Sequence, residues 1–191
     1  APLAVLLTIP VRSEELMAGE RPAGFSPGVV LALDHSGLLA LSFMPVKSYR
    51  GLFGTELTTI TIDPCVADEP VRYLAQICKD AGDRFIVSVD SKNAFRKALS
   101  KLGVKVFPAI EENITPNVAR HQLIADMKTT FGAGEIVAAA AGHSTERTQS
   151  RYGYYQNGRK RRGYVAVLAA RPPRAGFISR VRRLKSGARS R

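Results

Sequence analysis

The first part of the chain carries short apolar runs that are separated by turn residues. Residues 28–43 contain two such runs, and residues 34–37, Asp-His-Ser-Gly, are typical of a turn between antiparallel strands. Residues 57–62, Leu-Thr-Thr-Ile-Thr-Ile, alternate β-branched positions and predict a third strand. We therefore expect a small three-stranded antiparallel sheet, with Lys47 in the loop after its second strand.

Most of the remaining chain has apolar residues at helical spacing. The predicted helices are residues 3–18, 71–82, 91–103, 115–132 and 134–142, with a continuation from residue 146. Gly82 and Gly103 are expected to end the second and third of these. Thr115 is expected to cap the fourth, with Pro116 at its first position.

Two runs are less clear in type. Residues 83–89 are apolar but ambiguous, and residues 163–170 are strand-like. The 191 residues suit one domain of ordinary size. The pattern predicts an α+β fold that is mostly helical, in which the small three-stranded antiparallel sheet packs beside a helical bundle.

Charge is concentrated near the C-terminus. Residues 159–191 hold 12 of the 28 Lys and Arg residues and none of the 16 Asp and Glu residues, so the rest of the chain is neutral within a net charge of +12. Such a block is typical of an arm that binds a polyanion. We favour a nucleic acid over a membrane surface or a merely solvated tail, because no strongly amphipathic aromatic helix accompanies the charge.

Composition argues against several kinds of protein and site. The apolar runs are much shorter than the ~20 residues of a membrane-spanning helix, and the N-terminus lacks the basic start of a signal peptide. Two Cys and three His without a Cys-x-x-Cys pair make a structural zinc site unexpected. We expect a cytoplasmic protein with reduced thiols and no metal or other cofactor.

Five side chains suited to phosphate chemistry occur in separate segments. Arg12 lies in an Arg-Ser-Glu-Glu-Leu run, Lys47 in an expected turn, and Arg120 near the start of an expected helix. His143 follows a glycine and precedes Tyr152 by nine positions. Each also has an ordinary structural explanation, such as a surface ion pair, a solvated lysine, a helix cap or a packing aromatic.

In this order and spacing, the set resembles the catalytic domain of the tyrosine recombinases, the phage-integrase family. That family has an arginine followed by a Glu-Leu pair, a lysine in a β-turn, a His-x-x-Arg-His helix, and a Gly-His pair about nine residues before a tyrosine. The matching positions are Arg12 with Glu15-Leu16, Lys47, Arg120-His121, Gly142-His143 and Tyr152. The resemblance extends over residues 6–155.

The resemblance implies a site-specific recombinase or integrase, encoded by a bacterium, a phage or another mobile genetic element. Such an enzyme cleaves and rejoins DNA through a 3′-phosphotyrosine without a metal ion. Arg12 and Arg120 would each donate paired hydrogen bonds to the phosphate, and His143 would donate another. Lys47 would protonate the leaving 5′ oxygen, and Tyr152 would be the nucleophile.

Asn117 departs from the family pattern, because it stands where the family has histidine. An amide can position a phosphate or the tyrosine but cannot take a proton. His121 is expected to pack inward and to substitute poorly. The alternatives are therefore a weakened or inactive DNA-binding module of the same fold and a type IB topoisomerase-like enzyme, with Tyr154 or Tyr155 as fallback nucleophiles.

The resemblance also suggests how the chain is organised. We expect residues 1–158 to form the catalytic domain, without the family's N-terminal core-binding domain, and residues 159–191 to form a basic arm. The residues expected to bind DNA there are Arg159, Lys160, Arg161 and Arg162. The expected partners are double-stranded DNA and, in a full-length protein, further copies of the chain in a tetramer assembled through the C-terminal segment.

Overall fold

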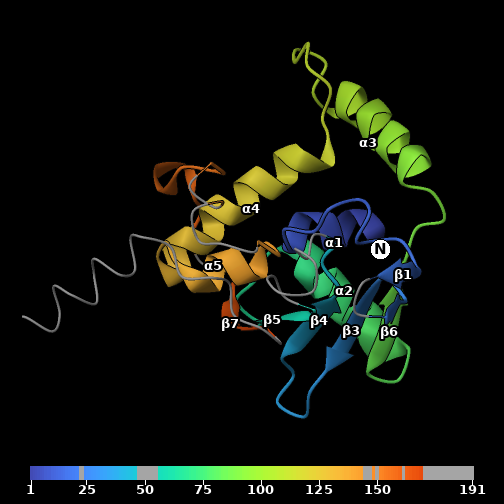
Figure 1. Ribbon diagram of the computed structural model, residues 1–191, viewed down its shortest axis with the longest axis vertical. Helices are drawn as coiled ribbons and strands as arrows, with labels where there is room; N and C mark the ends of the chain where they lie inside the picture. The colour runs from blue at the N-terminus through green and yellow to red at the C-terminus, as the bar shows by residue number, and fades with distance from the viewer. Residues whose placement is uncertain (22–23, 47–55, 144–147, 149–150, 161, 170–191) are drawn as a thin grey trace, which may run out of the picture.

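The computed structural model describes residues 1–21, 24–46, 56–143, 148, 151–160 and 162–169. The helices are α1 (Pro2–Thr8), α2 (Glu69–Asp80), α3 (Lys92–Val106), α4 (Pro116–Phe131), α5 (Glu135–Ala140) and a 3-10 turn, η1 (Tyr155–Asn157). The strands are β1 (Gly19–Arg21), β2 (Gly24–Ser26), β3 (Val29–Leu33), β4 (Leu39–Phe43), β5 (Thr58–Ile62), β6 (Arg84–Val87) and β7 (Tyr164–Ala169) (Figure 1).

The main sheet has the strand order β6-β3-β4-β5-β7, and every neighbouring pair is antiparallel. Alternate residues of its central strand, Leu39, Leu41 and Phe43, are buried in the core. Leu41 lies opposite Leu31 on one side and Ile60 on the other. The three strands predicted from the first part of the chain are therefore confirmed, and their alternation places one face against the helices.

The predicted size of this sheet is wrong, since five strands rather than three form it among the described residues. The ambiguous run 83–89 supplies β6, which pairs with β3, and the strand-like run near the C-terminal end supplies β7, which pairs with β5. Both additions are edge strands whose partners are distant in sequence. The class is mixed helix and strand as expected, but "mostly helical" understates the sheet.

The first helix is shorter than predicted. It ends at Thr8, and Ile9 has extended backbone angles of φ −129° and ψ 150°. Pro10 explains the end, because a proline lacks an N–H and disfavours helical geometry in the residue before it. The apolar spacing that continues to residue 18 belongs instead to a turn, which places Arg12 beyond the helix.

Two glycines have different effects on the helices that contain or follow them. Gly82 has a φ of 80° just after α2, as expected for a helix end. Gly103 does not end α3, which continues to Val106. A Cβ at Gly103 would lie 2.6 Å from Ile114 Cγ1, so the absence of a side chain there permits close packing.

The helices form a layer that positions the candidate site. Helix α2 lies against β3 and β6, α5 lies against β5 and β7, and α1 contacts both α2 and α4. Helix α3 projects away from this body, as Figure 1 shows. The buried Tyr164 hydroxyl of β7 donates to the Thr8 carbonyl at 2.8 Å, and burial raises the pKa of that hydroxyl. The sheet and α1 are thereby tied together beside the first half of α4.

Candidate active site

Four of the residues predicted to act on a phosphate meet beside the first half of α4. Arg120 Nη2 lies 3.2 Å from His143 Nε2, and the Arg120 guanidinium carbon lies 5.6 Å from the centre of the Tyr152 ring. The rings of His143 and Tyr152 have centroids 4.9 Å apart. Arg12 lies near enough for its charge to lower the pKa of Arg120. Residues far apart in sequence thus form one cluster.

Arg12 is held by a buried carboxylate. Its Nη1 lies 2.8 Å from Glu15 Oε1, and its backbone N–H donates to Glu15 Oε2 at 2.7 Å. Glu15 is fully buried and also accepts from the backbone N–H of Val46 at 3.2 Å. Glu15 therefore orients the Arg12 guanidinium and links the turn after α1 to the chain that follows β4.

Arg120 is almost fully buried, with 2% of its surface exposed. Its guanidinium donates to the backbone carbonyls of Pro10 and Ala141. Burial, followed by the positive charge of Arg12, lowers the Arg120 pKa to about 10, while Glu15 and Tyr152 favour the charged form. The side chain therefore remains a cation at neutral pH, fixed between the end of α5 and the turn after α1.

The Gly-His pair ends α5 and places His143 in the site. Gly142 has a φ of 58°, and the His143 N–H donates back to the Ala138 carbonyl at 2.8 Å. This is the geometry of a Schellman motif, in which glycine adopts the left-handed conformation. A Cβ at Gly142 would lie 2.8 Å from Pro45 Cβ. The Gly142-His143 dipeptide thus ends α5 and also supplies the side chain that is predicted to bind the phosphate.

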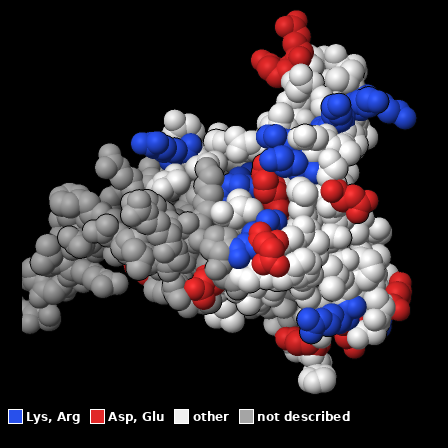
Figure 2. Space-filling view, turned by 45° about the vertical axis from the view of Figure 1, so that its right-hand side comes forward, with Lys and Arg blue, Asp and Glu red and all other residues white. Residues whose placement is uncertain are grey.

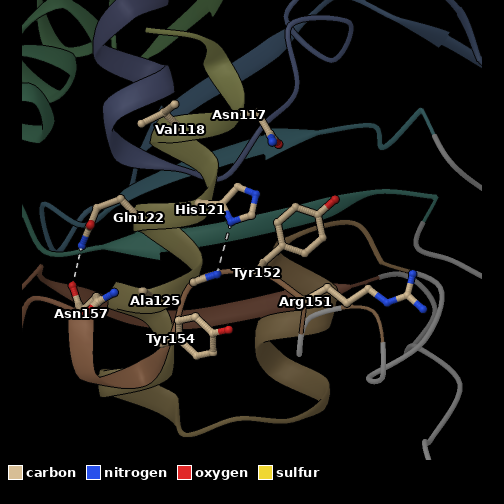
Figure 3. Close-up of a pocket in the computed structure, with 10 residues that line it drawn as sticks. Asn117, Val118, His121, Gln122, Ala125, Arg151, Tyr152, Tyr154 and Asn157 are labelled. Atoms are coloured by element: carbon tan, nitrogen blue, oxygen red, sulfur yellow. Dashed lines mark hydrogen bonds between the residues drawn. The ribbon is translucent and has the colours of Figure 1, made fainter. Parts of the chain in front are cut away.

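Tyr152 borders a cavity of about 630 Å³ (Figure 3). Its ring packs against two histidines, with centroid distances of 4.7 Å to His121 and 4.9 Å to His143. The exposed Asn117 lines the same cavity from the first turn of α4. The structure therefore places Asn117 and the predicted nucleophile on the same cavity.

His121 lies nearer to Tyr152 than the sequence suggested. It is half-buried rather than packed into the core, and its Nδ1 accepts from the Gly153 N–H at 3.4 Å (Figure 3). When Nδ1 accepts, a neutral imidazole carries its proton on Nε2. In this arrangement His121 orients the chain beside Tyr152 and is not poised to take the tyrosine's proton.

The environment of His121 predicts a dependence of stability on pH. Burial and the charges of Arg120 and Lys128 lower the pKa of His121. The unfolded chain therefore binds this proton at higher pH than the folded chain. The contribution of neutral His121 to stability is complete above the ordinary pKa of about 6.5 and is lost as the pH falls through and below that value.

We expect the free energy of unfolding to fall less in His121→Gln than in the unaltered chain between about pH 7 and about pH 5. Urea titrations at several pH values measure this difference. The exposed His35 in the β3–β4 turn offers the matched control, because His35→Gln should keep the original pH dependence. Equal pH dependence in His121→Gln and the unaltered chain would contradict the assignment.

The predicted DNA-binding residues are placed differently from one another. Arg159 and Lys160 are exposed. Arg162 instead forms ion pairs of 2.7 Å with both Asp68 and Asp126, and Asp126 is fully buried.

Lys47 and Arg161 lie outside the described residues. Residues 164–169, which the division at residue 159 assigns to the basic arm, form β7 in the main sheet.

Two polar residues of α4 were not singled out in the sequence. Asp126 and Lys128 lie six and eight positions after Arg120 and are both buried. Their contacts are with the chain around and after Tyr152. The only signal in the sequence is two charged residues inside an otherwise apolar stretch of helix, and that pattern does not reveal their partners.

The described residues show no gathering of three His, Cys, Asp or Glu side chains that suits a metal ion. None of the helices they form combines the length and apolar character needed to cross a membrane. No protein-family model and no curated protein matches the chain.

Among solved structures, a crystal structure of XerA recombinase is similar, with a TM-score of 0.50 and 16% sequence identity. The match covers 100% of this chain and 56% of that one, so the chain spans little more than half the length of the recombinase. At this identity the similarity shows a shared fold.

Proposed function

We propose that the chain cleaves and rejoins DNA through a covalent bond to Tyr152, with the chemistry of a tyrosine recombinase. The observation that supports this most strongly is the setting of Tyr152. Its ring lies between His121 and His143, beside the Arg120 guanidinium, and borders the cavity. A tyrosine that only filled the core would have no reason to lie among cationic and polar groups at a cavity.

In the proposed reaction, the Tyr152 oxygen attacks the phosphorus of a DNA phosphodiester. A bond forms between phosphorus and the tyrosine oxygen while the bond to the 5′ oxygen breaks. The tyrosine gives up its proton to solvent water. The leaving 5′ oxygen gains a proton, and we assign Lys47 as its donor. Attack by a 5′ hydroxyl on the phosphotyrosine reverses the step and rejoins a strand, because the phosphate ester has been conserved.

The cationic groups would stabilise the negative charge that develops on the phosphate. Arg12 and Arg120 each carry five N–H donors. The Pro10 and Ala141 carbonyls fix the plane of the Arg120 guanidinium, and its buried Nε–H has no hydrogen-bond partner among the described residues. Arg120 and His143 are both buried in this arrangement, so we propose that the residues over them move aside when DNA binds, which would let this N–H and His143 donate to a phosphate oxygen.

The proposed substrate is double-stranded DNA. Helix α3 contains five Lys or Arg residues and no acidic residue, and Figure 2 shows basic side chains on this projecting element. We propose that α3, the exposed Arg159 and Lys160, and the basic C-terminal segment contact the phosphate backbone. Binding should then weaken steeply as salt increases. Assembly into a tetramer on DNA through the C-terminal segment belongs to the same proposal.

The second candidate is a DNA-binding protein of this fold that does not cleave. Asn117 is the observation that favours it, because an amide at the cavity cannot accept the tyrosine's proton. Such a protein would bind DNA with the same salt dependence but form no covalent complex. A gain of covalent complex in Asn117→His would instead identify an enzyme weakened at this position.

A pool of nicked duplexes with randomised sequence beside the nick tests the proposal without knowledge of a target site. After cleavage near the nick, the short strand with the new 5′ hydroxyl diffuses away and the reaction cannot reverse. We expect a protein–DNA complex that survives detergent, and mass spectrometry after nuclease digestion should place the nucleotide on Tyr152. No complex, or a nucleotide on another residue, would contradict the proposal.

A further inference from the structure

The chain from residue 152 to residue 159, here called the tyrosine segment, lies directly on the surface of α4. Two glycines permit this approach. A Cβ at Gly153, where φ is 34°, would collide with the backbone oxygen of His121, and a Cβ at Gly158 would collide with that of Ala125. The main chain of the tyrosine segment is therefore in contact with the helix that carries Arg120.

Lys128 holds the end of this segment that contains the predicted nucleophile. Its Nζ donates to the carbonyl of Tyr152 at 2.6 Å and to that of Gly153 at 2.8 Å. The residue is only 6% exposed. Hydrogen bonds from a charged donor are stronger than neutral ones, and these two bonds fix the two peptide planes that follow Tyr152.

Other side chains of α4 hold the far end of the tyrosine segment. Gln122 Nε2 donates to the Asn157 carbonyl at 2.9 Å, and Thr129 Oγ1 donates to the Arg159 carbonyl at 3.0 Å. The Arg159 N–H donates to Asp126 Oδ1 at 2.7 Å. Removal of the Lys128 ammonium would therefore leave the segment attached to α4 and loosen it mainly around Tyr152.

We propose that Lys128 is a positioning residue for Tyr152, because its ammonium group fixes the main chain that carries the tyrosine ring between His121 and His143. This inference rests on the proposed role of Tyr152 as nucleophile. Lys128 does not touch the reacting atoms in this arrangement; it acts through the backbone of the residue that does. A misplacement of about 1 Å in a reacting group can reduce a rate about 100-fold.

Lys128→Met tests the assignment, because methionine keeps the length of the side chain but donates no hydrogen bond. Lys79→Met is the matched control, since Lys79 is an exposed lysine near the end of α2. Three quantities are measured for each variant: the single-turnover rate of covalent complex formation on the nicked pool, the affinity for an intact DNA duplex, and amide hydrogen exchange in residues 153–159.

For Lys128→Met we expect the rate to fall at least tenfold, the affinity to change less than twofold, and exchange to rise at least tenfold at residue 153, whose N–H donates to His121. Lys79→Met should change none of these. An unchanged rate, or a rate that falls only in proportion to affinity, would overturn the proposal. If the unaltered chain forms no covalent complex, the role of Tyr152 fails, and unchanged exchange in Lys128→Met would separately refute its hold on the segment.

Discussion

The Tyr152→Phe variant is expected to form no covalent complex on the nicked DNA pool while it keeps its fold and its affinity for DNA. The substitution removes only the hydroxyl group. The ring that packs against His121 and His143, at centroid distances of 4.7 and 4.9 Å, remains. A loss of complex can then be assigned to the loss of the nucleophilic oxygen. Detergent-resistant complexes are quantified by gel electrophoresis, and affinity by fluorescence anisotropy.

The two neighbouring tyrosines provide matched controls. Tyr154 and Tyr155 are 74% and 61% exposed, so their replacement by phenylalanine should neither disturb packing nor stop the reaction. Tyr154→Phe and Tyr155→Phe are therefore expected to form the complex at rates within about threefold of the unaltered chain, a margin of less than 1 kcal/mol in activation free energy. A complex formed by Tyr152→Phe but lost in either control would move the nucleophile to that neighbour.

Replacement of Asp126 by alanine is expected to lower the free energy of unfolding by about 3–5 kcal/mol, the range for breaking a buried ion pair. The Asp126 carboxylate is fully buried and accepts from the Arg162 Nε at 2.8 Å and from the Arg159 N–H at 2.7 Å. Its removal leaves buried donors without this acceptor and removes one of the contacts that hold the end of the tyrosine segment to α4. Urea unfolding monitored by circular dichroism measures the change.

Asp80 is the matched control, because it has the same local contact as Asp126 but is exposed, whereas Asp126 is buried. Gln76 Nε2 donates to Asp80 Oδ1 at 2.7 Å across one helical turn, just as Gln122 Nε2 donates to Asp126 Oδ1 at 2.7 Å. Asp80 is exposed, so Asp80→Ala should change stability by about 0.5 kcal/mol or less. A loss below about 1 kcal/mol in Asp126→Ala would show that the buried network does not hold the fold together.

The strands at the centre of the sheet could be predicted because their signal is local. Residues 39–43 alternate buried and half-buried positions, and the strand has one face on the core. The edge strands could not be predicted with the same certainty, since β7 gains its identity from β5, which lies far away in sequence. The end of α1 was predictable in principle from Pro10, but the apolar spacing beyond it resembled a longer helix.

The residues of the candidate site likewise include some that the sequence placed correctly and one that it did not. The resemblance to the tyrosine recombinases predicted that Arg12, Arg120, His143 and Tyr152 would act on one phosphate, and they lie together. The excess of positive charge in the C-terminal block assigned Arg162 to DNA, whereas the structure pairs it with two aspartates. Within a basic segment, the sequence does not distinguish an arginine that is exposed from one that is buried in an ion pair.

Helix α4 carries both a proposed phosphate-binding residue, Arg120, and the proposed positioning residue, Lys128. Arg120 and Lys128 are eight residues apart on it, about 12 Å along an axis that rises about 1.5 Å per residue. Arg12 belongs to a different segment, the turn after α1, which faces α4. A shift of α4 against α1 would therefore carry Arg120 and the backbone of Tyr152 together while it separated the two guanidiniums. The packing of α1 on α4 therefore sets the distance between the two guanidiniums.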